Sequence, residues 1–183
     1  MKNAADSPRT GFTLWLTGLS GAGKSTLARK IGADLSQRGY SVEVLDGDEI
    51  RLNLSKGLGY SKEDRDTNVR RIGFVAGLLA RNGVVTVVAA ISPYKNARDE
   101  VRRSHNGRFV EVYVQCSIEE LVKRDVKGLY ARALRGDLQH FSGISDPYEA
   151  PESPEIVVST DHQTADQSSL AILSWLEAHQ LIG

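Results

Sequence analysis

Hydrophobic residues are concentrated in short runs that alternate with longer segments of mixed polarity. The runs are rich in Val, Leu and Ile, and their shortness favours β-strands over helices. We predict strands at residues 12–17, 41–45, 84–91, 109–116 and 156–158. The run at 84–91 is continuous and rich in Val, which is typical of a central parallel strand buried on both faces.

The segments between these runs show helical periodicity. After the first strand, Leu27, Ile31 and Leu35 recur every four residues, and this helix should end near Arg38 with Gly39 as its C′ residue. A second helix, ending at residues 82–83, has the clearest apolar face, made by Val69, Ile72, Gly73, Ala76, Leu79 and Ala80. Both patterns place a helix against the predicted sheet.

The remaining helices are shorter or more charged. A charged helix is expected at about 94–104. Ser117 should cap a short helix, with Glu120 completing a capping box. The last helix should present one face made by Leu170, Leu173 and Leu176.

This alternation of strands and helices predicts an α/β fold, a parallel sheet with helices on both faces. The length of 183 residues favours one domain over 1–183, with 1–11 as a loose arm. Residues 128–154 lose the apolar period and accumulate Gly, Pro, Asp and Arg. A long irregular stretch inside a compact domain is usually functional or mobile, so we expect a lid there.

Composition narrows the classes of function. Lys and Arg total 23, as do Asp and Glu, so the zero net charge argues against nucleic-acid or membrane binding driven by charge. No run approaches the length of a membrane span, and the polar start lacks a secretory h-region, which makes the cytoplasm the expected compartment. The single Cys116 is expected in the core. The four His residues show no metal-ligand spacing and are expected at the surface.

Residues 18–25 match G-x-x-x-x-G-K-[ST], the Walker A phosphate loop, between a predicted strand and a predicted helix. Its glycines allow successive N–H groups to point at a phosphate, and the helix N-terminus adds its positive dipole end. Lys24 should reach the outer phosphates, and the Ser25 hydroxyl should ligate Mg²⁺. The nucleotide-binding loop comprises Gly18, Leu19, Ser20, Gly21, Ala22, Gly23, Lys24, Ser25 and Thr26.

Ligands of open parallel sheets bind beyond the carboxyl ends of the strands. The second strand delivers Asp46 and Asp48 there, and the third delivers Ser92. Asp48 is a candidate to accept a proton from an attacking hydroxyl or to hold Mg²⁺ through water. An ordinary Asp-Gly-Asp turn is the alternative interpretation.

Two basic clusters have both a functional and a neutral interpretation. Arg51, Arg65, Arg70 and Arg71 lie near Tyr60, and guanidinium groups match phosphate and sulfate geometry. Acidic residues are interspersed, so a solvated helix face is equally consistent. The lid and its approach carry Lys123, Arg124, Lys127, Arg132 and Arg135, which suit closure over polyphosphate, although a plain surface loop is the alternative.

Taken together, the motifs resemble one family, adenylylsulfate kinase, from about Phe12 to Val158. Its marks are GLSGAGKST at 18–26, LDGD at 45–48, Arg51 followed by LGYSKEDRDTNVRRI at 58–72, ISPY at 91–94, RDVKGLY at 124–130 and FSGISDPYEAPESPE at 141–155. Their order and spacing make the resemblance specific. Tyr60, Lys95 and Val126 depart from its usual Phe, Arg and Pro.

The resemblance implies a P-loop nucleoside triphosphate hydrolase-like fold and transfer of the ATP γ-phosphoryl group to the 3′-hydroxyl of adenosine 5′-phosphosulfate. Lys24, Asp46, Asp48 and Ser92 would be catalytic, with Ser92 matching a serine described in the family as a phosphorylated intermediate. ATP and Mg²⁺ would be bound at the phosphate loop. A homodimer, and an association or fusion with ATP sulfurylase, are also implied.

The same resemblance implies an acceptor site. Arg51, Arg65 and Asn68 would grip the phosphosulfate, and Tyr60 and Phe141 would flank its adenine. The full implied set is Asp48, Arg51, Tyr60, Arg65, Asn68, Ile91, Ser92, Lys127 and Phe141.

Three alternatives stay open at the level of sequence. One is another small-molecule P-loop kinase, and a second is a catalytically silent kinase domain from a sulfurylase fusion. A nucleotide-gated switch is the third, although a GTPase would need an N-K-x-D motif that the chain lacks.

Overall fold

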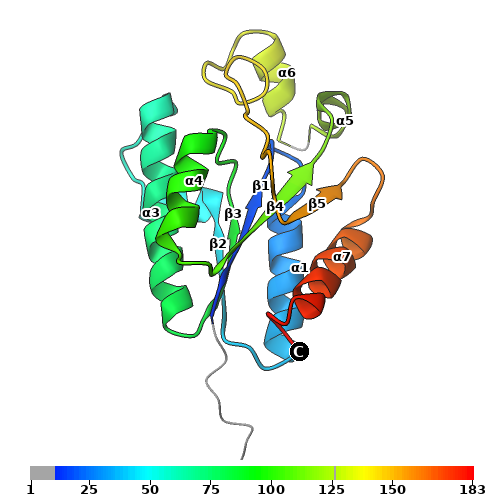
Figure 1. The fold of residues 1–183 in the computed structure, drawn as a ribbon. Helices are drawn as coiled ribbons and strands as arrows, with labels where there is room; N and C mark the ends of the chain where they lie inside the picture. Colours follow the sequence, from blue (N-terminus) through cyan, green and yellow to red (C-terminus); the bar gives the residue numbers. More distant parts are fainter. Residues whose placement is uncertain (1–10, 126) are drawn as a thin grey trace, which may run out of the picture.

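The structure is a computed structural model that describes residues 11–125 and 127–183. Within them, five parallel strands form one sheet in the order β2-β3-β1-β4-β5 (Figure 1). The strands are β1 (Thr13–Thr17), β2 (Val42–Asp46), β3 (Val85–Ala89), β4 (Phe109–Gln115) and β5 (Ile156–Ser159). The predicted parallel sheet and the positions of its strands are therefore confirmed.

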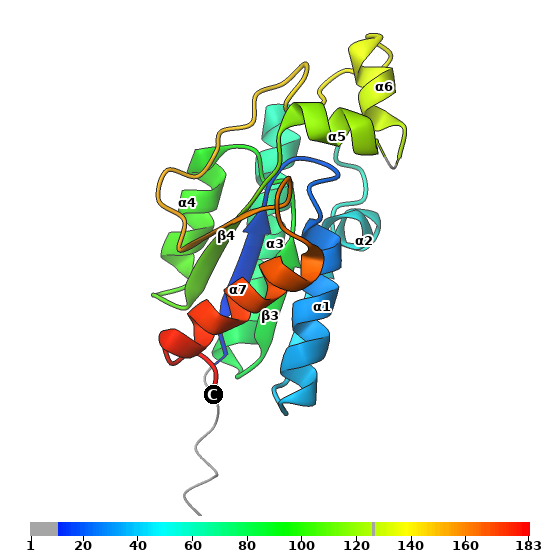
Figure 2. The same ribbon diagram turned by 90° about the vertical axis from the view of Figure 1, so that its right-hand side faces the viewer.

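Helices cover both faces of the sheet (Figures 1 and 2). Helices α1 (Lys24–Gln37) and α7 (Ala165–Ala178) pack on one face, and α3 (Lys62–Arg81) and α4 (Lys95–Ser104) on the other. Each face has its own apolar core, which includes Leu14 and Leu16 on the α1 side and Trp15 and Val88 on the α3 side. Successive side chains of β1 point to opposite faces of the sheet, so this strand contributes to both cores.

Three short helices lie near the carboxyl ends of the strands: α2 (Gly47–Asn53), α5 (Ile118–Arg124) and α6 (Leu129–Leu134). Two were not predicted. Asp46 caps α2 by accepting from the backbone N–H of Asp48, so the Asp-Gly-Asp sequence starts a helix instead of forming a simple turn. Helix α6 lies inside the stretch expected to be irregular, where Tyr130 and Ala133 are buried.

Several local predictions are corrected. Leu170 is 65% exposed, and Ile172 instead joins Leu173 and Leu176 in the core. Ser117 does cap α5, but its own N–H donates to the carboxylate of Asp161, so a capping box with Glu120 does not form.

Further predictions concern buried single residues and the chain start. Cys116 is buried as predicted, whereas His105 is buried rather than at the surface. Gly11 is packed closely against residues 80 and 84, so the predicted arm does not extend to it. Residues 1–10 of that arm and Val126 lie outside the described residues. In the part of the chain that the structure describes, none of the helices is both long and apolar enough to cross a bilayer.

Candidate active site

A cleft of about 780 Å³ opens at the carboxyl edge of the sheet. It lies where β1 and β3 are neighbours and the helices that follow them, α1 and α4, leave to opposite faces. This is the topological switch point at which open α/β sheets bind ligands. The site predicted from the strand ends is therefore a real concavity.

The phosphate loop forms one wall of the cleft. Gly18 has a φ of 154°, and a Cβ there would lie 2.3 Å from the carbonyl oxygen of Val114, so only glycine fits. Gly23 has a φ of 97° and caps α1 without a side chain, which leaves the helix N-terminus open toward the cleft. Of the nine predicted residues, Ser20, Gly21, Gly23, Lys24, Ser25 and Thr26 line the cleft.

The other three loop residues support it from behind. Ala22 is fully buried, and Leu19 lines a separate shallow hollow beside Gly143. The carbonyl of Leu19 accepts a hydrogen bond of 2.7 Å from Lys24 Nζ. The lysine is therefore already held over the loop without a phosphate.

The charge of Lys24 is poorly solvated. The side chain is 8% exposed, and burial lowers its pKa to about 8, against the opposing attraction of Asp48 and Asp46. Lys127 lowers the pKa further by repulsion. A phosphate would supply the missing counter-charge, as expected for a P-loop lysine.

The strand-end acids face the loop across the cleft. Asp46 and Asp48 line it, and Asp48 Oδ2 lies 2.5 Å from Lys127 Nζ. This pair is exposed at both ends, so it contributes little stability and can exchange partners. Among the described residues, no group of three or more His, Cys, Asp or Glu could hold a metal ion. The available oxygen donors, one hydroxyl and two carboxylates, fit Mg²⁺ because that ion keeps waters and phosphate oxygens as further ligands.

Ile91 and Ser92 line the floor of the cleft. Ser92 is 3% exposed and has a φ of 40°, a conformation rare for a residue with a side chain. Its Oγ accepts from Trp15 Nε1 at 3.0 Å and donates to Thr17 Oγ1 at 3.0 Å. The Ser92 hydroxyl therefore both accepts and donates a hydrogen bond within the protein.

The second wall carries the predicted basic cluster. The guanidinium groups of Arg51 and Arg65 lie 4.2 and 5.5 Å from the centroid of the Tyr60 ring. Both arginines line the cleft with Tyr60 and Asn68, and Asn68 Oδ1 is buried without a partner. Arg70 and Arg71 instead point away, Arg70 to Glu100 and Arg71 to the carbonyl of Leu54. Two of the four arginines therefore line the cleft, and the other two make surface contacts outside it.

Phe141 does not line the cleft in this structure. Its ring packs edge-on against Tyr130 with centroids 5.0 Å apart; Tyr130 belongs to the apolar core on the α1 side, and Phe141 packs against that core. The preceding residue, His140, accepts a hydrogen bond from Arg65 through its carbonyl. Phe141 is thus next to the second wall, and its predicted contact with adenine stays a prediction.

Two contributors were not identified from the sequence. Tyr130 lines the cleft and donates to the carbonyl of Ser20 at 2.7 Å, which ties α6 to the phosphate loop. Arg98 is buried and pairs with Glu111, the one charged residue of the largely apolar strand Phe109–Gln115. The carboxylate within this strand is the feature of the sequence that indicates a buried ion pair, because a buried carboxylate needs a partner.

The chain is similar to known proteins. The model of the adenylylsulphate kinase family matches residues 10–159. An adenylyl-sulfate kinase of Rippkaea orientalis is 56% identical over 167 residues, covering 91% of this chain and 92% of that protein. A probable bifunctional SAT/APS kinase of Sorangium cellulosum is 60% identical over 92% of this chain, which spans 29% of that protein.

A solved structure is also similar. The APS kinase of Mycobacterium tuberculosis in complex with AMPPNP and APS has a TM-score of 0.88 at 40% identity, covering 93% of this chain and 99% of that chain. The parallel sheet with its Walker A loop and these similarities define the class, an ATP-dependent P-loop kinase. Within that class, the chain belongs to the adenylylsulfate kinase family.

Proposed function

We propose that this kinase transfers the γ-phosphoryl group of ATP directly to the 3′-hydroxyl of adenosine 5′-phosphosulfate. The observation that carries the proposal is the shared cleft, which Lys24 lines from the phosphate loop, Arg51 and Arg65 line from the second wall, and Asp48 lines as well. One wall suits the polyphosphate of ATP, and the other suits the phosphosulfate and the base of the acceptor.

Each group then has a role in one displacement. The 3′-oxygen forms its bond to Pγ while the bond from Pγ to the β,γ-bridging oxygen breaks, and ADP leaves. Asp48 accepts the proton of the hydroxyl, and Lys24 stabilises the charge on the transferring group. Ser25 and, through water, Asp46 would hold Mg²⁺, which would neutralise phosphate charge when bound.

The acceptor residues follow from the second wall. Arg51 and Arg65 would grip the phosphosulfate, and Tyr60 would stack on adenine, with Phe141 on its other face after closure. Asn68 offers its unpartnered Oδ1 to a donor on the acceptor. Ile91 and Ser92 would form the floor, and Lys127 would leave Asp48 for the phosphates as the lid closes.

Release of ADP with a panel of acceptors tests the function. We expect turnover with ATP and adenylylsulfate, and none with AMP, shikimate or gluconate. Turnover with one of these and none with adenylylsulfate would favour another small-molecule kinase. Absence of turnover with every acceptor would favour a silent kinase domain.

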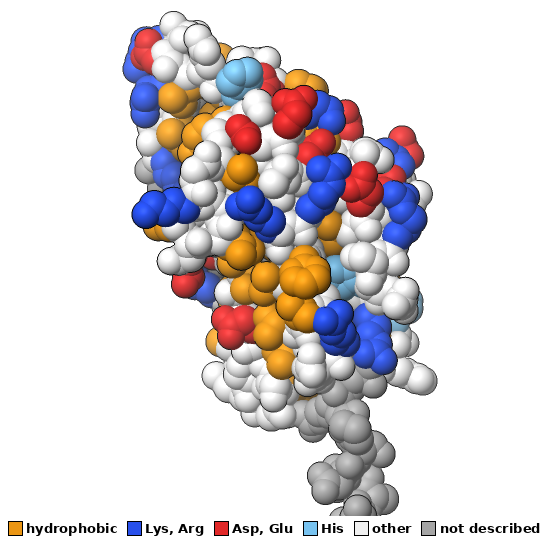
Figure 3. Space-filling view, turned by 90° about the vertical axis from the view of Figure 1, so that its left-hand side faces the viewer, with side chains coloured by type: hydrophobic (Ala, Val, Ile, Leu, Met, Phe, Trp, Pro, Cys, Tyr) orange, Lys and Arg blue, Asp and Glu red, His pale blue; other side chains and the backbone are white. Residues whose placement is uncertain are grey.

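We also propose a homodimer in the cytoplasm. Hydrophobic side chains gather on the face that contains α3 (Figure 3), and Phe74 of that helix is 66% exposed. A contiguous exposed apolar patch is typical of a protein interface, whereas a single exposed residue is not. Light scattering should give twice the chain mass, and Phe74→Glu should give the mass of one chain; a wild-type monomer would contradict the dimer.

The Sorangium relative motivates a further proposal, an association with ATP sulfurylase. We expect a mixture of the two enzymes to co-elute, because one polypeptide carries both names in that relative. Independent elution at every concentration tested would argue against it.

A further inference from the structure

Arg98, near the start of α4, makes three directional hydrogen bonds from a position that is 2% exposed. Its Nε donates to Glu111 Oε1 at 3.0 Å, inside β4. Its Nη1 donates to the carbonyl of Ser92, and its Nη2 to the carbonyl of Glu149, both at 2.7 Å. One planar guanidinium therefore joins a strand, the floor of the cleft and a segment 51 residues away.

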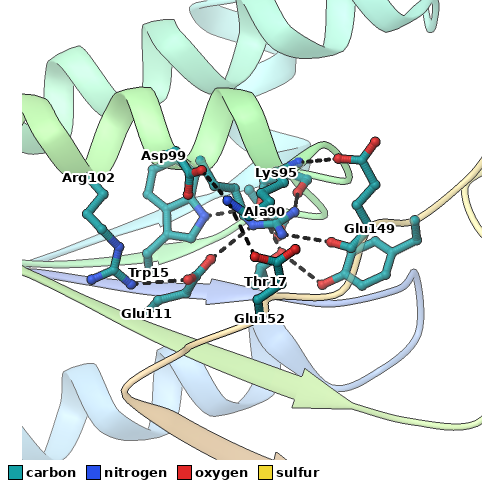
Figure 4. A network of polar contacts seen from close by, with 12 residues as sticks. Trp15, Thr17, Ala90, Lys95, Asp99, Arg102, Glu111, Glu149 and Glu152 are labelled. Carbon is teal, nitrogen blue, oxygen red and sulfur yellow. Dashed lines mark hydrogen bonds and ion pairs between the residues drawn. The ribbon is translucent and has the colours of Figure 1, made fainter.

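The same two segments are fastened at further points (Figure 4). The N–H of Glu149 donates to the carbonyl of Pro93 at 2.8 Å, and its carboxylate accepts from the N–H of Lys95 at 2.6 Å. That carboxylate caps α4 from a distant part of the chain, where Tyr94 at the N-cap provides no side-chain cap. Glu149 is therefore bonded directly to Pro93 and Lys95, which follow the floor residue Ser92, as well as to Arg98.

Tyr148 completes the connection to the phosphate loop. Its hydroxyl lies 3.0 Å from Thr17 Oγ1, in the last residue of β1, and Thr17 itself donates to the carbonyl of Ile91 at 2.8 Å. Because Thr17 uses its proton on Ile91, Tyr148 is the donor to Thr17. The segment that follows Phe141 is thus fixed to the strand that leads into the phosphate loop.

These bonds fix a strained backbone. The left-handed conformation of Ser92 costs on the order of 1–3 kcal/mol and persists only where its surroundings determine it. The Ser92 carbonyl is held by Arg98, and its hydroxyl by Trp15 and Thr17. Loss of the guanidinium fork would remove the bonds to the Ser92 and Glu149 carbonyls and leave the direct bonds of Glu149 to Pro93 and Lys95 to join the two segments.

We propose that Arg98 is a positioning residue for the acceptor, setting the floor residues Ile91 and Ser92 relative to the segment that carries Phe141. The inference rests on the proposed function for the identity of the acceptor. Arg98 touches neither the cleft nor the reacting atoms, since it acts through two carbonyl groups. The phosphate loop, which is the proposed ATP site, forms the opposite wall, so ATP binding should be affected much less.

Arg102 provides a matched control in the same network. It lies one helical turn later and pairs with Glu111 and Glu155, but with neither loop. Both substitutions, Arg98→Lys and Arg102→Lys, keep a positive charge beside Glu111 but replace the planar guanidinium by an ammonium group. Only the first removes the bonds to Ser92 and Glu149, because an ammonium cannot reproduce three divergent contacts.

Steady-state kinetics with each substrate varied separately test the proposal. Arg98→Lys should raise the KM for adenylylsulfate by about tenfold or more, the size expected when a remote change misplaces a bound substrate, with little change in the KM for ATP. Arg102→Lys should change neither. An unchanged acceptor KM in Arg98→Lys, equal increases for both substrates, or an equal effect of Arg102→Lys would overturn the proposal.

A milder variant keeps the test valid if Arg98→Lys does not fold. Tyr148→Phe removes only the hydroxyl that fixes the same segment to β1, and Tyr113→Phe, whose ring stacks on Tyr148 at 6.1 Å, is its control. Tyr148→Phe should raise the acceptor KM selectively and Tyr113→Phe should not; an acceptor KM equal to wild type in both would refute positioning through this segment. If the wild type phosphorylates a different acceptor, only the proposed function fails, because the same comparisons are then made on that acceptor's KM.

Discussion

Trp15 Nε1 donates to Ser92 Oγ over 3.0 Å, so the hydroxyl that the family resemblance links to a phosphorylated intermediate accepts a hydrogen bond in a buried position. Direct in-line transfer needs no covalent intermediate. We therefore expect Ser92→Ala to keep substantial activity. Removal of the hydroxyl leaves the Trp15 N–H unpaired and should lower the free energy of unfolding by about 1–3 kcal/mol.

Stereochemistry at a chiral γ-phosphate checks the mechanism, and urea unfolding checks the stability. Inversion agrees with one displacement, whereas retention would show that a phosphoenzyme lies on the path. Ser142→Ala is the stability control, because Ser142 is equally buried and its Oγ lacks a partner among the described residues. Its unfolding free energy should change much less.

Lys24→Ala should abolish turnover while the fold is retained. The ammonium donates to the Leu19 carbonyl, and its removal relieves a poorly solvated charge. Loss of an electrostatic contact to the transferring group should raise the barrier by about 3–4 kcal/mol, by analogy with oxyanion donors. Turnover at the wild-type rate in a folded variant would contradict the phosphate-loop assignment.

The lowered pKa of Lys24 predicts a pH dependence of nucleotide binding. In the free enzyme the pKa is about 8, and the phosphates of a bound ATP analogue should raise it. At a pH above the pKa of the free enzyme, binding of the analogue must therefore take up a proton. As the pH rises further, the affinity for the analogue should fall by about tenfold per pH unit until the pKa of the complex is reached.

Calorimetry in buffers of different ionisation enthalpy measures this proton uptake directly. It should be small near neutral pH and approach one proton about one unit above the free pKa. Lys24→Met should show weaker binding with no such pH dependence. An analogue affinity that is constant across this range in the wild type would show that Lys24 stays charged in the free enzyme.

His105 predicts a separate dependence of stability on pH. Burial lowers its pKa, while its Nδ1 hydrogen bond to the Val101 carbonyl opposes the shift, and Nε2 is buried without a partner. The unfolded chain has the ordinary value of about 6.5, so it binds a proton more readily than the fold. Stability should therefore be lost as the pH falls from about 6.5 through the folded value, and be regained on return.

Urea unfolding at several acidic pH values tests this sign. His105→Gln should flatten the slope of unfolding free energy against pH in that window. The exposed His162, replaced in the same way, is the control. A slope that is identical in His105→Gln and the wild type would assign the dependence to other groups.

The sequence predicted the sheet and its main helices because each apolar period is local. Leu27, Ile31 and Leu35 need no knowledge of the rest of the chain to indicate a helix face, and all three are buried. Prediction from the sequence failed where contacts with distant parts of the chain decide which residues are buried. Leu170 has the period of its helix, but it is exposed in the folded chain and Ile172 is buried.

The candidate site shows the same division. Lys24 and Asp48 could be predicted because their roles follow from motif and strand end, and the structure does bring them into one cleft. Arg98 could not be assigned, since its three partners lie 6, 13 and 51 residues away in sequence. Only the fold brings these partners to one guanidinium.

The expected lid is more firmly packed than the sequence suggested. Tyr130 is 2% exposed, donates to the phosphate loop and packs edge-on against Phe141, so this stretch buries apolar side chains although it lacks a regular apolar period. Protection from hydrogen exchange should therefore be present in α6 without nucleotide. The exposed residues 135–137 and 139–140 should exchange rapidly and become protected with an ATP analogue, because their basic neighbours gain phosphate partners.

Phe141→Ala tests whether this segment also completes the acceptor site. If the ring closes on the base of the acceptor, affinity for adenylylsulfate should fall more than affinity for ATP, since the ordering of the segment is drawn from binding energy. Leu134→Ala, an exposed apolar residue of the same segment, controls for loss of local packing. Equal hydrogen exchange with and without nucleotide would remove closure from the mechanism, and a loss of affinity confined to ATP would place Phe141 at the other wall.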